Sequence, residues 1–326
     1  MTLKFIDLFA GIGGIRLGFE QNGMECVFSS EWDRFAVQTY HANFGEMPHG
    51  DITKISTDEI PYHNILAGGF PCQPFSTIGK RQGFEHETQG NLFFEILRIL
   101  KAKKPSAFLL ENVPGIRTID GGRVFQLILE KLDDLGYYTT PLDLNAVDYG
   151  VPQNRKRVYF VGVLKEYGRS FDYENPQPLH CGIGQYIERN AKGYDMSEHI
   201  VNTYLFKKQD GRPEIVDENT DTPVKTLVST YHKIQRLTGT FVKDGEKIRL
   251  LTENECKVIM GFPRSFEIPV SRTQMYRQMG NSVAVPVINS IAYQLKVFLE
   301  TNGEKYSKEF DEGDLVWTQI ELLSQV

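Results

Sequence analysis

The sequence is poor in cysteine and contains no long apolar run. Its four cysteines, Cys26, Cys72, Cys181 and Cys256, are widely separated. None of them forms the Cys-x-x-Cys pair that is typical of metal sites and redox motifs. We therefore expect free thiols in a reducing cytoplasm and no metal site. The first residues lead directly into a strand-like stretch, so we expect neither a signal peptide nor a membrane span.

An excess of positive charge is also missing. The chain has 36 basic and 42 acidic residues, a net charge of −6 that argues mildly against a nucleic-acid partner. The charges are segregated, however, because residues 225–249 and 150–169 each carry a local charge of +4. This segregation favours a basic cleft with acidic outer faces, and phosphates respond to the field of the cleft. For any single lysine, a solvated surface position remains the simpler alternative.

The dinucleotide spacing Gly-x-Gly-x-x-Gly is absent as well, which counts against an NAD-dependent dehydrogenase. A strand at residues 3–9 is followed by a turn containing Gly11, Gly13 and Gly14, and then by a helix to about residue 22. A strand, a glycine turn and a helix N-terminus bring the backbone close to a ligand at the edge of a parallel sheet.

Acidic and aromatic residues follow the next strands. A strand at residues 25–30 ends at Glu31 and Trp32. A carboxylate there suits the hydroxyls of a ribose, and the indole offers a stacking face for adenine, although core packing is an even alternative for a tryptophan. Asp51 could accept a hydrogen bond from an adenine amino group, or could simply cap the turn that follows it.

Cys72 is the candidate nucleophile. It stands between Pro71 and Pro74, after a short apolar run that predicts a buried strand. Because proline restricts its own backbone and that of the residue before it, the loop is stiff and holds a thiol in place. The alternative is that Cys72 is a small buried apolar residue, the commoner fate of a free cysteine.

Glu111, Arg155 and Arg157 are the other candidate catalytic residues. A buried strand at residues 107–113 delivers Glu111 to its C-terminal end, where burial would raise the pKa of the carboxyl group and suit it to handle a proton. The alternative is a capping or turn-forming role. Arg155 and Arg157 precede and enter a strand ending at residue 164, and strand alternation places both on one face.

The chain resembles the DNA (cytosine-5) methyltransferases of bacterial restriction–modification systems from residue 5 to about residue 300. The resemblance is carried by nine short motifs in the order and spacing of that family. They are DLFAGIGG at 7–14, EW at 31–32, GDI at 50–52, GFPCQPFS at 69–76, GNL at 90–92, ENV at 111–113, QNRKR at 153–157, RL at 249–250 with MGFP at 260–263, and GNS at 280–282.

The resemblance implies an α/β fold: a mostly parallel, Rossmann-like sheet with helices on both faces, bound to S-adenosylmethionine, and a small, mainly-β target-recognition domain. It implies that the Cys72 thiolate adds to C6 of a flipped-out cytosine in a short double-stranded DNA site, so that C5 accepts the methyl group. Glu111 would hold N3 and N4, Arg155 would contact the O2 side, and Arg157 would support that pocket.

The resemblance also implies two sets of binding residues. Those for S-adenosylmethionine, released as S-adenosylhomocysteine, are Phe9, Gly11, Ile12, Glu31, Trp32, Asp51, Ile52, Pro71, Leu92, Asn281 and Ser282, with Asn281 also bracing the active-site loops. Those for DNA are Gln73 and Ser76 beside the flipped base, Lys80 and Arg81 in a lid-like loop, and Thr226, Tyr231, His232 and Arg236 as readers of the target.

We expect a catalytic domain at 1–168, a target-recognition domain at 169–250, a return to the catalytic domain at 251–300, and an acidic tail at 301–326. The enzyme is expected to be a cytoplasmic, nucleoid-associated monomer, with a cognate restriction endonuclease acting separately if one exists. Two alternatives stay open: the same chemistry on tRNA, and a catalytically silent DNA-binding regulator. The absence of Pro-Pro-Cys and Cys-Phe-Thr disfavours the first, and the intact Cys72, Glu111 and Arg155 disfavour the second.

Overall fold

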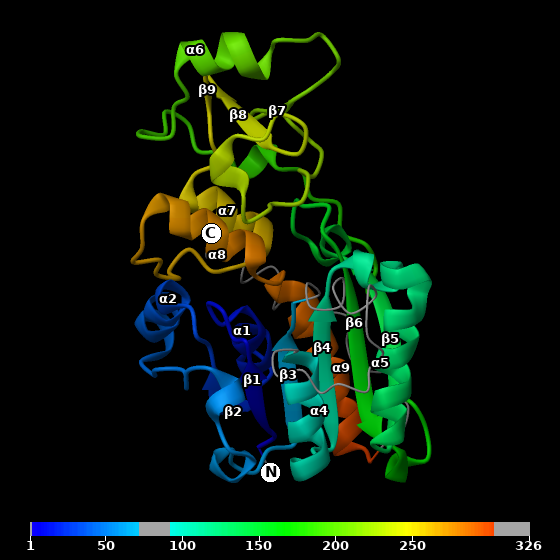
Figure 1. Cartoon of the computed structure of the whole chain (residues 1–326). Helices are drawn as coiled ribbons and strands as arrows, with labels where there is room; N and C mark the ends of the chain where they lie inside the picture. Colours follow the sequence, from blue (N-terminus) through cyan, green and yellow to red (C-terminus); the bar gives the residue numbers. More distant parts are fainter. Residues whose placement is uncertain (1, 72–91, 303–326) are drawn as a thin grey trace.

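The structure is a computed structural model that describes residues 2–71 and 92–302. Its larger sheet has six strands in the order β2-β1-β3-β4-β6-β5 (Figure 1). Their bounds are β1 Lys4–Leu8, β2 Glu25–Ser30, β3 Ile65–Gly69, β4 Ala107–Asn112, β5 Tyr137–Asn145 and β6 Lys156–Leu164. Strands β1 to β4 pair in parallel, and β6 is antiparallel to both β4 and β5. The predicted mostly parallel sheet is therefore confirmed.

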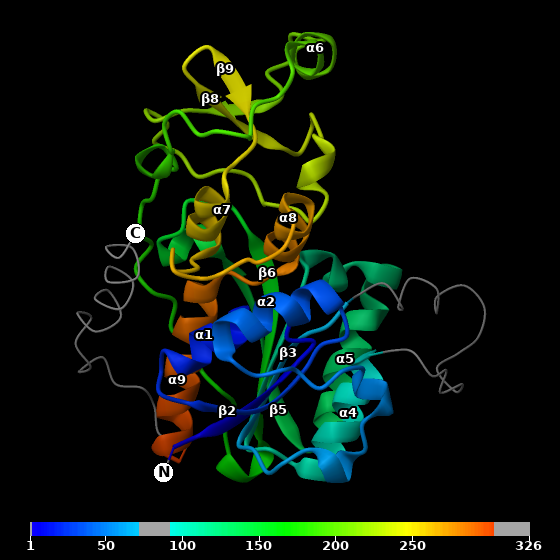
Figure 2. The same cartoon turned by 90° about the vertical axis from the view of Figure 1, so that its left-hand side faces the viewer.

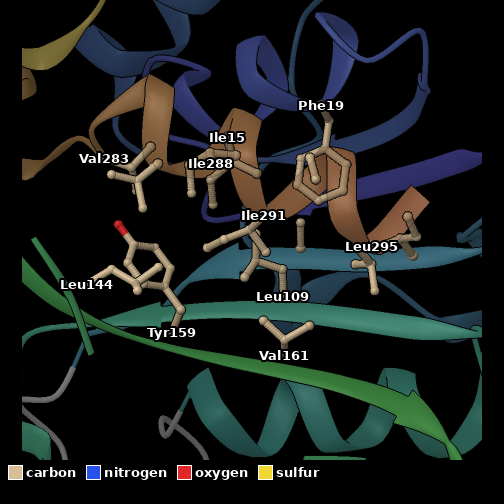
Figure 3. Packing of buried hydrophobic residues seen from close by; sticks show 14 of the residues in the cluster. Ile15, Phe19, Leu109, Leu144, Tyr159, Val161, Val283, Ile288, Ile291 and Leu295 are labelled. Carbon is tan, nitrogen blue, oxygen red and sulfur yellow. The ribbon is translucent and has the colours of Figure 1, made fainter. Parts of the chain in front are cut away.

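Helices cover both faces of this sheet (Figure 2). Helices α1 (Gly14–Glu20) and α9 (Val285–Glu300) lie on one face, while α4 (Leu92–Lys103) and α5 (Arg123–Asp134) lie on the other. On the α1–α9 face, Phe19, Ile288 and Ile291 pack over Leu109 and Val161 of the sheet (Figure 3). The alternation of the buried strands thus supplies two separate apolar cores, one for each helical layer.

The last helix returns to the beginning of the chain. The Asn22 side chain, just after α1, donates a hydrogen bond to the side-chain oxygen of Asn289 at 2.6 Å, across 267 positions of sequence. Contrary to the expectation that no stretch approaches membrane-spanning length, Arg272–Glu300 is long and apolar enough to cross a membrane, but 72% of its most apolar window is buried inside the protein. It is therefore a core element of the fold.

A second, smaller sheet lies above the C-terminal edge of the large one (Figure 1). It consists of β7 (Glu214–Val216), β8 (Thr240–Asp244) and β9 (Lys247–Arg249), and the short helix α6 (Glu198–Ile200) lies at its far end. Its core continues into α7 (Glu253–Met260), α8 (Arg272–Asn281) and Ala36 of α2 (Arg34–Phe44). Helix α7 begins with a capping box formed by Thr252 and Glu255.

Candidate active site

A cavity of about 820 Å³ opens between the C-terminal edge of the large sheet and the part of the chain that carries the small sheet. Its floor comes from the ends of β1, β3 and β4, and its opposite wall comes from residues 227–233 and from α8. Ligands bind outside the carboxyl ends of strands in open α/β sheets, so this position is the expected one. The cavity lining includes Phe9, Gly11, Ile12, Glu31, Trp32, Pro71, Glu111, Arg155, Arg157, His232, Asn281 and Ser282.

Glu31 is fixed by the backbone around it. Its Oε2 accepts a hydrogen bond from the Gly11 amide at 2.9 Å, and its Oε1 accepts from the amides of Trp32 at 2.9 Å and Asp33 at 2.7 Å. Burial raises the pKa of this carboxyl group, and the three amides oppose the rise. A carboxylate accepts about four hydrogen bonds, so one position stays available to a hydroxyl donor in the cavity.

Trp32 is 80% exposed at the rim of the cavity. The alternative that it packs in the core is therefore wrong. An indole left in water at a cavity rim is costly unless a ligand covers it, and its flat face suits an aromatic base.

One wall of the cavity is closed by a contact between Gly14, near the start of the chain, and residues 282 and 283. A Cβ added at Gly14, the first residue of α1, would lie 2.7 Å from Ser282 Oγ and 2.9 Å from Val283 Cγ2. Only glycine allows this close approach, so the GIGG turn and the GNS motif are packed against one another. This contact brings Asn281 and Ser282 into the same cavity as Glu31.

Glu111 forms an ion pair with Arg157 across neighbouring strands. Glu111 stands opposite Tyr159 in the β4–β6 ladder, and Arg157 Nε lies 3.0 Å from Glu111 Oε1. Both side chains are largely buried, at 13% and 12% exposure. Burial raises the pKa of Glu111, while Arg157 and, less strongly, Arg155 oppose the rise. The raised pKa makes this carboxyl group easier to protonate than an exposed one.

Arg155 is buried at the wall of the same cavity, among backbone carbonyl oxygens. It is 2% exposed and donates hydrogen bonds to the carbonyl oxygens of Leu227 at 3.0 Å and Gly280 at 3.1 Å, and also to that of Ser282. Burial and the neighbouring Arg157 lower the pKa of Arg155 to about 9, so it stays charged at neutral pH. Arg155 thus joins α8 to residue 227, and Arg157 makes the direct contact with Glu111.

The predicted DNA readers divide into two groups. His232 lines the cavity, and the Thr226 hydroxyl donates to the Asn154 carbonyl oxygen at 2.6 Å from a half-buried position. Tyr231 is 3% exposed and its hydroxyl bonds to the backbone of Thr240, while Arg236 is 4% exposed and satisfied by protein acceptors. Because both side chains are buried and bonded within the protein, the structure contradicts the prediction that Tyr231 and Arg236 contact bases.

Several predicted residues lie apart from the cavity. Asp51 caps a short 3₁₀ turn, accepting from the Thr53 amide at 3.1 Å and hydroxyl at 2.8 Å, as its alternative interpretation stated. Ile52 is buried in the core below, and Leu92 packs against that same core. Cys72, Gln73, Ser76, Lys80 and Arg81 lie outside the described residues.

Sequence reasoning missed the contribution of α8. Gln274 and Arg277 of this helix line the cavity, as does Lys233 after Tyr231. The short helix before the GNS motif gave no strong amphipathic pattern, so its cavity-facing residues could not be distinguished from its solvent face. Among residues 2–71 and 92–302, no group of three or more His, Cys, Asp or Glu residues is arranged to hold a metal ion.

Comparisons with known proteins agree with this site. Residues 3–297 match the family model described as C-5 cytosine-specific DNA methylase. The chain is 57% identical over 314 residues to the type II methyltransferase M.MspI of Moraxella sp, covering 96% of this chain and 75% of that protein. It is 55% identical over 299 residues to M.BsuFI of Bacillus subtilis, covering 91% of this chain and 73% of the relative.

Solved structures share the fold. The Entamoeba histolytica methyltransferase EhMeth aligns with a TM-score of 0.75 at 23% identity, covering 92% of this chain and 99% of that one. This second likeness shows the fold alone. The match along 3–297 and the identity to the type II enzymes show more: the chain belongs to the C-5 cytosine-specific DNA methylases and is a type II DNA (cytosine-5) methyltransferase that methylates a specific DNA sequence.

Proposed function

We propose that this enzyme takes its methyl group from S-adenosylmethionine held beside Glu31 and Trp32. We further propose that it attaches the group to C5 of a cytosine turned out of a short double-stranded DNA site, with Cys72 as the nucleophile. The observation that supports this most directly is that the Glu111–Arg157 pair and the Glu31–Trp32 wall line one continuous cavity. A methyl donor and a base could therefore meet within it.

The walls of the cavity fit the methyl donor. Glu31 has a free acceptor position for a ribose hydroxyl, and Trp32 offers its exposed face to adenine. Phe9, Gly11, Ile12, Pro71, Asn281 and Ser282 complete the enclosure. When bound, the cofactor supplies an electrophilic methyl group carried on a sulfonium. Asp51, Ile52 and Leu92 stay predictions for this site.

The remaining chemistry belongs to residues of the chain. C5 of cytosine is a weak nucleophile, and addition of the Cys72 thiolate to C6 moves the C5–C6 π electrons onto C5, which then forms the new carbon–carbon bond. A base removes the C5 proton, and the released electron pair restores the double bond and expels the thiolate. Glu111 would hold N3 and N4, and its raised pKa lets it share a proton with N3 as negative charge develops.

Arg157 and Arg155 keep this arrangement in place. Arg157 fixes the orientation of the Glu111 carboxylate through the 3.0 Å ion pair. Arg155 directly precedes β6 and donates to the carbonyl oxygens of Leu227 and Gly280, so it attaches the wall formed by residue 227 and α8 to the large sheet. We propose that the base leaves the duplex because C5 is inaccessible in the stack, a step that costs a few kcal/mol.

We also propose the domain boundaries 1–168, 169–250 and 251–300, a monomeric enzyme and a location in the bacterial cytoplasm. The change from the large sheet to the small one after Leu164 supports the first boundary. Helices α7 and α8 share the core of the small sheet, and α9 packs on the large one, so the return to the large sheet is complete at α9. The identity to two bacterial type II methyltransferases supports the location.

Bisulfite sequencing tests the proposal. A plasmid is incubated with the purified protein and S-adenosylmethionine, and protected cytosines should recur at one short motif. Cys72→Ser should abolish protection while DNA binding is kept, and Cys181→Ser, a matched change at a buried thiol outside the cavity, should leave it intact. Full protection by Cys72→Ser would contradict the covalent route.

A modified duplex tests the covalent step itself. Once the motif is known, its target cytosine is replaced by 5-fluorocytosine, whose fluorine cannot leave C5 as a proton does. The thiolate then cannot be expelled after methylation, so a stable protein–DNA adduct should form with the wild type and with Cys181→Ser. An adduct formed equally by Cys72→Ser would place the nucleophile elsewhere.

A further inference from the structure

Arg236 binds an entire loop through its guanidinium group. The side chain donates to the carbonyl oxygens of Leu205 at 2.7 Å, Lys208 at 3.0 Å and Arg212 at 2.9 Å. It also forms an ion pair with Asp210, with a hydrogen bond of 3.0 Å from Nη1 to Oδ2. Residues 205–212, which we name the clasped loop, are thus held at four points by one buried cation.

The clasped loop presents apolar and positive groups to solvent. Phe206 is 46% exposed, and Lys207, Lys208 and Arg212 are all exposed. Asp210, the loop's acidic residue, is neutralised by Arg236, so three uncompensated positive charges face outward. The chain as a whole has a net charge of −6, so the sign of the charge on this loop is opposite to that of the whole chain. Its field attracts a polyanion.

Arg236 connects the clasped loop to the rim of the active-site cavity. Arg236 follows His232 and Lys233, which line the cavity, after only two intervening residues. Tyr231 anchors this stretch, because its hydroxyl donates to the Thr240 carbonyl oxygen and accepts from the Leu251 amide. In Figure 2 the yellow-green helical turn of residues 231–233 lies on the same side of the small-sheet region as α6.

We propose that Arg236 is a positioning residue that shapes the clasped loop into a DNA-binding ledge, with Lys207 and Lys208 on the phosphates of the duplex beyond the flipped base. The inference rests on the proposed function, since it needs duplex DNA across the cavity. Holding the loop in advance removes the entropy that a free eight-residue segment would lose on binding. Neither lysine has an acidic partner among the described residues, so both are available to phosphate.

Salt dependence of DNA binding separates this role from a merely structural one. Each phosphate contact adds about 0.9 to the slope of log affinity against log salt. The double variant Lys207→Ala/Lys208→Ala should therefore lower the slope by about 2 and raise the KM for DNA about tenfold, with kcat retained. Arg236→Ala should reproduce both changes, because the released loop no longer presents its lysines. The KM for S-adenosylmethionine should not move.

The matched control is Lys101→Ala/Lys103→Ala, which removes the same charge at the C-terminal end of α4, remote from the cavity. It should keep the wild-type slope. If Arg236→Ala does not fold, Arg236→Lys is measured in its place. Lysine keeps the positive charge but lacks the planar guanidinium group that binds several acceptors at once, so the slope of log affinity against log salt should fall in part.

Two results would overturn the proposal. An Arg236 variant that melts at a lower temperature but keeps the wild-type slope would make the clasp structural only. If the Lys207→Ala/Lys208→Ala variant kept the wild-type salt dependence of DNA binding, the two lysines would not contact the DNA phosphates. A wild-type enzyme that neither methylates nor binds duplex DNA would instead contradict the proposed function itself, and the clasp with it.

Discussion

Asp7 is a buried acid whose titration should control the stability of the enzyme. It stands in β1 with no exposure to solvent, and neither carboxylate oxygen has a partner in hydrogen-bonding geometry within the described part of the chain. The nearby Arg16 is engaged by Glu20, Glu46 and Tyr40. Burial therefore dominates over the attraction of Arg16 and raises the pKa of Asp7 to about 8.

The direction of the effect follows from the order of the two pKa values. The folded-state pKa lies above the unfolded one, so the folded protein binds this proton more tightly. The stabilisation is fully present below about pH 4 and is lost as the pH rises through about 8. One proton corresponds to about 1.4 kcal/mol per pH unit, which gives a loss of about 2 kcal/mol between pH 6 and pH 8.

Asp7→Asn replaces the titratable carboxyl group with an amide of nearly the same shape. Urea unfolding at pH 6, 7 and 8 would give the free energy of unfolding of both proteins, and the variant should gain about 2 kcal/mol relative to the wild type over that range. Asp143→Asn, an exposed carboxylate paired with Arg117, is the control and should follow the wild type. A difference between wild type and Asp7→Asn that stays constant from pH 6 to pH 8 would show that Asp7 is charged throughout, and would refute the reasoning.

Three further predictions concern the site. Glu111→Gln should lower the single-turnover rate roughly 10²-fold with little change in the KM for the cofactor, because it removes charge stabilisation at the base; a normal rate would exclude that role. Trp32→Ala should raise the KM for S-adenosylmethionine about tenfold at constant kcat, since stacking on an aromatic ring contributes about 1–3 kcal/mol; an unchanged KM would mean that the ring is not covered by adenine. Gly280→Ala should destabilise the protein by about 1–3 kcal/mol in urea unfolding and lower activity. Its Cβ would lie 2.2 Å from the Ser229 amide nitrogen, whereas Gly50→Ala meets nothing within 4 Å and should behave as wild type in both assays.

The large sheet was predictable because its strands are short apolar runs with clear ends. The strand predicted at residues 25–30 is observed at Glu25–Ser30, and the strand predicted to end at residue 164 ends at Leu164. Helix α2 was not predicted, although Asp33 caps it through the amides of Phe35 and Ala36. Its apolar residues do not all lie on one face of the helix, so the pattern in the sequence gave little indication of a helix.

The basic residues of 225–249 show where sequence reasoning stops. Arg236 and Arg249 were counted toward a basic cleft, yet both are buried, and Arg249 is bound by Glu255 and Asp244. A guanidinium group serves a phosphate and a cluster of carbonyl and carboxylate oxygens equally well. Whether an arginine faces a phosphate or protein oxygens depends on residues that are distant in the sequence. A single sequence does not show which of these residues fold against the arginine. The Glu111–Arg157 pair was hidden for the same reason, since strand pairing creates it.

The contact between Asn22 and Asn289 has a consequence for synthesis on the ribosome. The apolar face of α1 and of its side of the large sheet packs against α9, which is made last among the described helices. At roughly 5–20 residues per second, the 267 positions between these partners take about 13–50 s to translate. During that interval the nascent chain carries an uncovered hydrophobic face, which makes it a substrate for chaperones until α9 emerges from the exit tunnel.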